Sequence, residues 1–199
     1  MPTRTFIEEA RRRQLIDAAI STVNELGYHR ASLAEIASRA HIAKSAIVYH
    51  FSSKEGLLLD LVGTVFAAVG ESVLSAVDGV VGPAARLRAY AGAYLAHIDA
   101  HRREIAAAVE VAVSHRTADG TPLYLVDDEG DAALLRSILK AGIDDGSFLP
   151  MPLDIASGLA ESVLDRAITV VQRNPRADLT ELRSHALPFL FRALEGEST

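Results

Sequence analysis

The sequence predicts an all-α protein of about nine helices, with a small N-terminal helix-turn-helix domain and a larger C-terminal helical domain. Apolar residues recur at helical spacing along most of the 199-residue chain. No alternating apolar and polar run is long enough to predict a strand, and no internal repeat is found. We expect the first domain to comprise residues 1–54 and the second residues 55–199.

The first predicted helix begins near the basic run Arg11–Arg13 and ends at Gly27. Its apolar positions keep helical spacing, and glycine is common just past a helix end. We expect the three arginines in its first turn or just before it.

A helix-turn-helix is predicted between residues 32 and 54. Ser32 and Glu35 form a capping box, in which the serine oxygen accepts a backbone N–H and the glutamate reaches back to the cap. His41 occupies the turn, where a positive φ is expected and histidine is tolerated better than most residues. The apolar face of the first helix of the pair consists of Leu33, Ile36, Ala37 and Ala40.

The second helix of the pair has an apolar inner side and a polar, aromatic and basic outer side. The inner positions are Ile42, Ile47 and Phe51, and the outer ones are Lys44, Ser45, Val48, Tyr49 and His50. Ser52 or Ser53 is expected to cap the following helix, with Glu55 completing a second capping box with Ser52. Such an outer side suits a helix that enters a DNA groove.

These residues resemble a known family over about positions 10 to 60. The match rests on Gly27-Tyr28, Ser32-Leu33, Ile36-Ala37, Ile42, Tyr49-His50-Phe51 and Ser53-Lys54-Glu55-Gly56-Leu57. In these positions the chain resembles the N-terminal domain of the tetracycline-repressor (TetR) family of bacterial transcription regulators. The rest of the chain resembles that family only in its helical pattern.

The resemblance implies that one surface contacts double-stranded operator DNA. It places Ser32, Lys44, Ser45, Tyr49, His50 and Lys54 on that surface, together with Ala46 and Val48. Ser32 and Lys54 lie at helix N-termini suited to phosphate, whereas Lys44 or Ser45 can reach a base edge. Tyr49 and His50 either donate to phosphate oxygens or form a surface-packed aromatic pair.

Four positions depart from the family pattern and affect base readout more than DNA binding. His41 replaces the turn glycine and Ala43 a common serine, while Ala46 and Val48 stand where a hydroxyl residue and a tyrosine are frequent. Val48 can offer only apolar contact to a thymine methyl group.

Charge is unevenly distributed along the chain. Residues 1–54 hold eight Arg and Lys against five Asp and Glu, a balance of +3, although the whole chain carries −6. A basic segment on an acidic body suggests a nucleic-acid-facing end. The Arg11–Arg13 run is either a basic arm that reaches phosphate or the minor groove, or a solvated run paired with Glu8 and Glu9.

Apolar spacing predicts the remaining helices in order. They cover residues 57–77, 87–98 after the break that ends at Pro83, 105–113, 134–146, 155–170 and 179–194, the last kinked at Pro188. Asp127, Asp128 and Glu129 favour the N-terminus of the fourth of these helices, and Asp154 and Asp178 can cap the last two.

The last two helices are apolar over most of their circumference. Such helices have two faces to bury. The resemblance implies that the pair forms a four-helix interface in a homodimer, which would present two recognition helices to half-sites about one or more DNA turns apart.

One side of a predicted helix offers a candidate effector site. Tyr90, Tyr94, His97 and His101 lie along it, either lining a small-molecule pocket or forming a core stripe with satisfied polar tips. His97 and His101 have helical metal spacing but no clear third ligand, so no metal is predicted. Further candidates for the pocket are Phe66, Glu110, Tyr124, Glu161 and Asp165.

The sequence argues against an enzyme and against secretion. It contains no cysteine and no catalytic motif, so no cofactor is expected. The N-terminus lacks a signal-peptide pattern, and no apolar stretch is expected to approach the roughly 20 residues of a membrane span, which predicts a soluble cytoplasmic protein.

The function predicted from these observations is that of a ligand-responsive repressor, which binds a palindromic operator as a homodimer and is released by a small molecule. Two alternatives stay open. The first is a dimeric helical scaffold with a vestigial helix-turn-helix, which Ala43, Ala46 and Val48 suggest. The second is an enzyme whose site carries no known motif.

Overall fold

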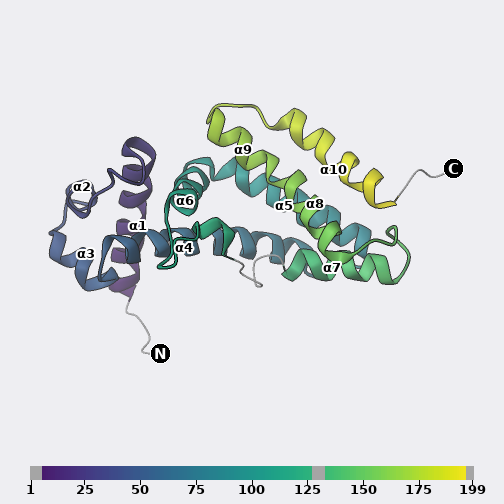
Figure 1. Cartoon of the computed structure of the whole chain (residues 1–199), viewed down its shortest axis with the longest axis horizontal. Coiled ribbons are helices and arrows are strands. Elements are labelled where there is room, and N and C mark those ends of the chain that lie inside the picture. The colour runs from purple at the N-terminus through teal and green to yellow at the C-terminus, as the bar shows by residue number, and fades with distance from the viewer. Residues whose placement is uncertain (1–5, 127–132, 196–199) are drawn as a thin grey trace. The chain divides into compact units, whose positions relative to one another are not determined.

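The computed structural model describes residues 6–126 and 133–195, which form an all-α fold (Figure 1). These ranges contain no strand, and an isolated bridge joins Arg116 to Pro122. The predicted fold class is therefore confirmed. The elements are α1 (Phe6–Leu26), α2 (Leu33–Arg39), α3 (Lys44–Phe51), α4 (Lys54–Val77), α5 (Pro83–Ala100), α6 (Arg102–Ser114), the 3-10 helix η1 (Leu123–Leu125), α7 (Ala133–Asp144), α8 (Leu153–Leu164), α9 (Arg166–Arg173) and α10 (Thr180–Glu195).

Two helix boundaries differ from the sequence prediction. α1 begins at Phe6, so the arginines at 11–13 lie in its second turn rather than at its start. The stretch predicted as one helix over 155–170 is divided at Asp165, whose carboxylate accepts a hydrogen bond from Tyr94 of α5. The acidic residues 127–129 lie outside the described residues.

The described residues group into two compact units. Unit 1 combines residues up to 67 with residues 103–126, and unit 2 combines residues 68–102 with those from 133 onward. Helix α6 belongs with the N-terminal helices: the Asn24 side chain of α1 donates to its Arg103 carbonyl, and the Tyr28 N–H donates to its Glu110 side chain. The division into domains at residue 54 stays a prediction.

In unit 1, the helix-turn-helix is held on α1 by apolar and polar contacts. Leu15, Ile36 and Ile47 are fully buried, and α1 packs against α2. The guanidinium of Arg39 donates to both carboxylate oxygens of Glu25, at 2.7 and 2.5 Å, which fixes α2 against α1.

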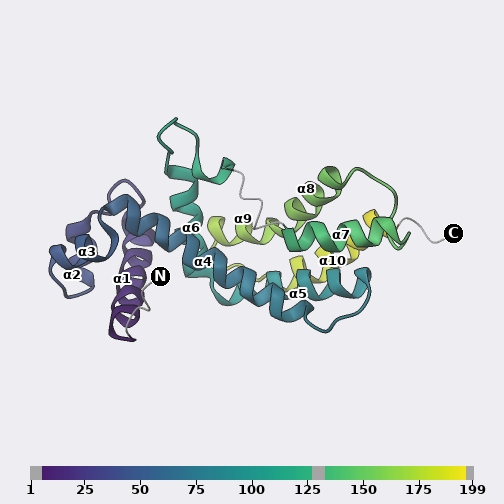
Figure 2. The same cartoon turned by 90° about the horizontal axis from the view of Figure 1, so that it is seen from below.

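In unit 2, α5 is the central helix. It packs against α7, α8, α9 and α10, and Figure 2 shows α7 alongside it. Leu87, Leu95 and Ile98 of α5 are buried with Leu135 of α7. Pro188 lies inside α10, as predicted.

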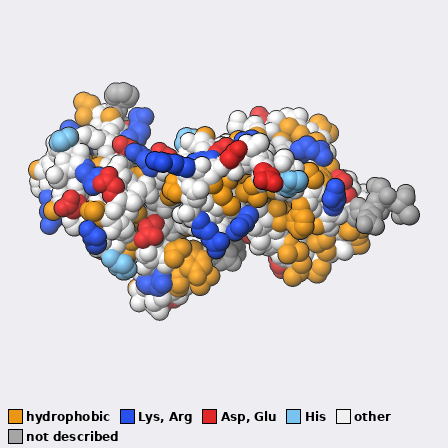
Figure 3. Space-filling model, turned by 90° about the horizontal axis from the view of Figure 1, so that it is seen from above, with side chains coloured by type: hydrophobic (Ala, Val, Ile, Leu, Met, Phe, Trp, Pro, Cys, Tyr) orange, Lys and Arg blue, Asp and Glu red, His pale blue; other side chains and the backbone are white. Residues whose placement is uncertain are grey.

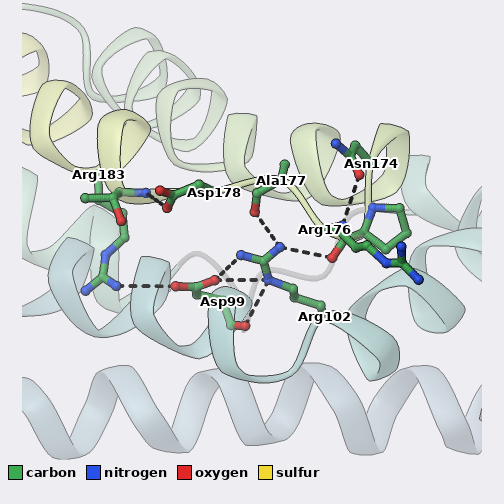
Figure 4. A network of polar contacts seen from close by, with 9 residues as sticks. Asp99, Arg102, Asn174, Arg176, Ala177, Asp178 and Arg183 are labelled. Carbon is green, nitrogen blue, oxygen red and sulfur yellow. Dashed lines mark hydrogen bonds and ion pairs between the residues drawn. The ribbon is translucent and has the colours of Figure 1, made fainter.

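A polar network joins the end of α5 to the connection between α9 and α10 (Figure 4). The guanidinium of Arg102 donates to the Ala177 carbonyl at 2.6 Å, to the Pro175 carbonyl at 3.0 Å and to the Asp99 carboxylate. Arg183 of α10 lies 3.5 Å from the same carboxylate. The network fixes the start of α10 on α5.

Helix α4 corrects the expectation that no apolar stretch approaches membrane length. By length and composition alone it could cross a bilayer, with a mean hydropathy of 1.8 over an 18-residue window. Its buried positions nevertheless follow one face of the helix, as in the core helix of a globular protein. They are Leu57, Leu58, Leu61, Val65, Val69, Val73 and Val77.

Candidate nucleic-acid interface

The Ser32 cap of the first helix and the turn after that helix have the predicted local structure. Ser32 has extended backbone angles, and its hydroxyl accepts the Glu35 N–H at 3.2 Å. His41 has a φ of 53°, and the following residue, Ile42, donates its N–H to the Ala37 carbonyl. The chain can therefore turn sharply from α2 into α3.

The recognition helix α3 has one buried and one exposed side. Ile47 and Phe51 are buried as predicted, and Ile42 just before the helix is half-buried. Tyr49 is 78% exposed and Val48 44% exposed. Among the other outward positions, Lys44 and Ser45 are exposed, and Ala46 and His50 are half-buried.

Tyr49 and His50 lie against each other at the end of this exposed side. Their ring centroids are 5.1 Å apart in an edge-to-face arrangement. The two rings thus form the packed aromatic pair that was one of the two interpretations. The exposure of Tyr49 still leaves its hydroxyl accessible to a phosphate.

The junction between α3 and α4 corrects the predicted second capping box. Ser52 ends α3 with a φ of 65°, and the hydroxyl of Ser53 accepts the Gly56 N–H at 3.0 Å. Ser53 is therefore the capping serine, because Ser52 is still engaged in the end of α3. Hydrogen bonds from its own amide and from the Ser53 hydroxyl lower the pKa of Glu55.

Lys54 lies at the start of α4, but its ammonium group is not free. It donates to the Tyr28 carbonyl at 2.8 Å and lies 4.8 Å from the centre of the Tyr28 ring. Tyr28 in turn is bound by α6 and by the residue after it, because its N–H donates to Glu110 of α6 at 3.3 Å and its hydroxyl lies 2.9 Å from Nδ1 of His115.

The three arginines of the run on α1 have different surroundings. Arg12 forms an ion pair with Asp60 of α4, and its guanidinium lies 5.2 Å from the centre of the Phe51 ring. Arg11 donates to Gln14 at 2.9 Å, and Arg13 is exposed. Arg12 therefore joins α1 to α3 and α4, and Arg13 has the exposure that a basic arm would need.

Four predicted effector residues meet in unit 2. The Tyr94 hydroxyl donates to Asp165 at 2.5 Å, and the rings of Tyr90 and Tyr94 are stacked with centroids 6.3 Å apart. Burial and the nearby Asp165 carboxylate raise the pKa of Tyr94. Burial also raises the pKa of Asp165, and burial together with the charge of Asp165 raises the pKa of Glu161. The cluster is therefore partly desolvated and acidic.

The other predicted effector residues lie outside this cluster. His97 and His101 are stacked with centroids 4.3 Å apart, and within the described ranges no group of three metal-ligating side chains exists. In unit 1, Glu110 binds Tyr28, Phe66 is half-buried and Tyr124 is 58% exposed. A surface cleft of about 520 Å³ contains none of the predicted residues. It is lined by Glu71, Leu74, Ser75, Val77, Asp78, Gly79 and Arg86.

Sequence reasoning missed the contacts that link Lys54 to Tyr28 and Tyr28 to His115. Tyr28 carries only a share of the family resemblance, and His115 lies 87 residues away in sequence. No local pattern signals a contact of this kind, because it arises only when α6 packs against the N-terminal helices.

Comparison with known proteins agrees with the resemblance seen in the sequence. Residues 15–61 match the model described as bacterial regulatory proteins, tetR family. The transcriptional regulator BetI of Yersinia pestis (strain Pestoides F) is 41% identical over 87 residues, which cover 43% of this chain and 44% of that protein. BetI of Serratia proteamaculans (strain 568) is 38% identical over 85 residues. The chain thus spans less than half the length of these curated relatives.

Solved structures share the fold over nearly the whole chain. The fatty acid degradation regulator FadR from Bacillus halodurans has a TM-score of 0.80 and 22% identity, covering 91% of this chain and 94% of that one. FadR from Bacillus subtilis, solved in complex with stearoyl-CoA, has a TM-score of 0.75 and 20% identity, covering 91% and 98%. At these identities the likeness establishes the architecture of both units.

Proposed function

We propose that this chain, whose residues 15–61 match the tetR family of bacterial regulatory proteins, is a homodimeric transcriptional repressor. It binds a palindromic operator and releases it when a small molecule binds. The observation that carries this proposal is α3, a helix anchored by its buried residues Ile47 and Phe51, whose exposed side presents Lys44, Ser45, Val48 and Tyr49. That side combines hydrogen-bond donors with an apolar position, as groove recognition requires.

The DNA contacts divide into two groups. Ser32, Tyr49, His50 and Lys54 contact phosphates and fix the position of the protein on the duplex. Lys44 and Ser45, with Ala46 and Val48 beside them, face the base edges. Because Ala46 and Val48 offer no hydrogen bond through their side chains, specificity at their positions comes from apolar contact or from DNA shape.

The proposed dimer forms through α8 and α10. Ile155 and Leu159 of α8 are 56% and 61% exposed, and Phe189 of α10 is 63% exposed. Figure 3 shows apolar side chains gathered at the C-terminal end of the chain. Two copies that pack these helices together would cover the apolar surface, and a two-fold axis would pair the two recognition helices with two half-sites.

The proposed effector site is the cluster of Tyr90, Tyr94, Glu161 and Asp165 in unit 2. The complex of the Bacillus subtilis relative with stearoyl-CoA supports a small-molecule ligand for this fold. A ligand lowers operator affinity only to the extent that it binds the DNA-free state more tightly than the DNA-bound state.

A DNA-binding regulator works where the chromosome is, so we place this protein in the bacterial cytoplasm. The one-sided burial of α4 supports its role as a core helix rather than a membrane span.

Selection of bound sequences from a random DNA pool tests the proposal. We expect a palindrome to be enriched, with half-sites one or more helical turns apart. A parallel selection with Lys44→Ala and Ser45→Ala should enrich an altered or weaker motif. If the wild-type protein enriches no sequence, the repressor function is wrong and the scaffold alternative gains support.

A further inference from the structure

Lys54 is held in place before any DNA is bound. Its ammonium group has three N–H donors, and one of them is used by the Tyr28 carbonyl at 2.8 Å. The face of the Tyr28 ring, 4.8 Å away, attracts the same charge. Two donors remain for a phosphate. A lysine that is already ordered loses less side-chain entropy on binding than a free one.

Tyr28 is held in turn by two side chains, one from α6 and one from the residue that follows this helix. Its backbone N–H donates to Glu110 at 3.3 Å, and its hydroxyl lies 2.9 Å from Nδ1 of His115. Gly27 just before it has a φ of 77°, so the chain turns sharply out of α1 at this point. The position of the Tyr28 carbonyl and ring therefore depends on α6.

Helix α6 is also bound to α1 near its other end. The Asn24 side chain donates to the Arg103 carbonyl at 2.9 Å, and the Arg103 guanidinium forms an ion pair with Asp17. Contacts at both ends fix α6 against α1 and against the segment that carries Tyr28. All of these residues belong to unit 1.

We propose that Tyr28 is a positioning residue for DNA binding, which holds the Lys54 ammonium where it meets a phosphate and is itself held by Glu110 and His115 at the C-terminal end of α6. This inference rests on the phosphate contact of Lys54 in the proposed function. It makes the strength of that contact depend on α6, which is not among the elements proposed to contact DNA.

A double-mutant cycle distinguishes positioning from a general structural role. The variants are Tyr28→Phe, Lys54→Ala and their combination, and the probe is a mixed-sequence DNA duplex long enough to span two half-sites. Affinity is measured at several salt concentrations. Lys54→Ala should lower the slope of log affinity against log salt by about 0.9 for each phosphate that is no longer neutralised. Tyr28→Phe, which removes only the bond to His115, should weaken binding about three- to tenfold.

The decisive result is the behaviour of Tyr28→Phe in the Lys54→Ala background. If Tyr28 acts through Lys54, the loss caused by Tyr28→Phe should disappear there. An equal loss in both backgrounds, or no loss in either, would overturn the inference. Should Tyr28→Phe unfold the protein, His115→Ala tests the same bond from the other side.

Two further variants separate the possible failures. Glu110→Ala should weaken binding as Tyr28→Phe does, whereas Glu104→Ala, a carboxylate on the same helix that lies near Arg103 and not near Tyr28, should not. If Lys54→Ala leaves affinity and salt slope unchanged while wild type binds the duplex, the phosphate role of Lys54 and this inference both fail but DNA binding stands. If wild type binds no duplex, the proposed function fails as a whole.

Discussion

Gly56 has no room for a side chain. A Cβ atom there would overlap the carbonyl oxygen of Phe51, the last residue of α3. We expect Gly56→Ala to destabilise the protein by about 1–3 kcal/mol and to weaken DNA binding, since the end of α3 must shift. Thermal unfolding and duplex affinity measure the two effects.

The matched control is Gly63→Ala on the same helix. Nothing lies within 4 Å of a Cβ at that position. Because alanine is the better helix former, this change should leave DNA binding intact and raise stability by up to about 1 kcal/mol. If Gly56→Ala and Gly63→Ala changed stability and DNA affinity equally, the close contact between Gly56 and Phe51 would not explain the effect.

The substitution Lys44→Ala, at the first residue of α3, tests base readout. Its side chain is exposed, and removal of a base contact should weaken a selected operator by about 1–3 kcal/mol while changing binding to unrelated duplexes much less. Lys140→Ala serves as the control, since Lys140 lies on α7 and pairs with Asp144 at 2.5 Å. An equal effect on both duplexes would make Lys44 a phosphate contact instead.

Residues whose structure depends on near neighbours could be predicted from the sequence. The Ser32 cap and the positive φ of His41 follow from the identities of residues a few positions away. The choice between Ser52 and Ser53 as cap depended on where α3 ends, which the sequence did not define. The contact of Lys54 with Tyr28 spans 26 residues and depends on tertiary packing.

At the scale of elements, the bounds of a helix could be predicted well where its apolar residues form a single stripe. α2 to α7 begin and end close to the predicted residues, because capping residues, glycine and proline mark their ends. The break between α8 and α9 could not be predicted, since it coincides with a bond from Tyr94, which lies 71 residues earlier. The same bond assembles the proposed effector cluster from α5 and the α8–α9 junction.

That junction should respond to pH. Burial raises the pKa of Asp165, and burial with the neighbouring charge raises the pKa of Glu161. Folding therefore favours their protonated forms. Their contribution to stability is complete below the ordinary pKa values and is lost as pH rises through the raised ones. Lowering the pH from about 7 to about 5 should thus favour the folded state at these two groups.

Asp165→Asn isolates this effect. The amide oxygen can still accept the Tyr94 hydroxyl, but the side chain no longer titrates. At neutral pH the variant should unfold at a higher temperature than wild type, and the difference should shrink in acid. Thermal unfolding across the pH range measures it. A lower unfolding temperature at neutral pH would show that the charged carboxylate stabilises the junction.

On the scale of the whole molecule, the proposed dimer depends on the apolar faces of α8 and α10. Leu159→Glu and Phe189→Glu would each bury an unpaired carboxylate in the proposed interface. This should weaken association about 100-fold or more and yield monomers at micromolar concentration in analytical ultracentrifugation. Val81→Glu changes an apolar residue that is 89% exposed in the α4–α5 turn, and should leave the dimer unchanged. A dimer that persists in all three variants would place the interface elsewhere.

The backbone at the two ends of α3 has a consequence for how the DNA-reading surface opens. His41, just before α3, and Ser52 at its end both have positive φ, a conformation that costs side-chain-bearing residues about 1–3 kcal/mol. An eight-residue helix gains little from its own hydrogen bonds. Amide hydrogen exchange should therefore be faster in α3 than in α1 or α4, and should slow when DNA is bound. The recognition helix α3 would thus become fully ordered only when the protein binds its operator.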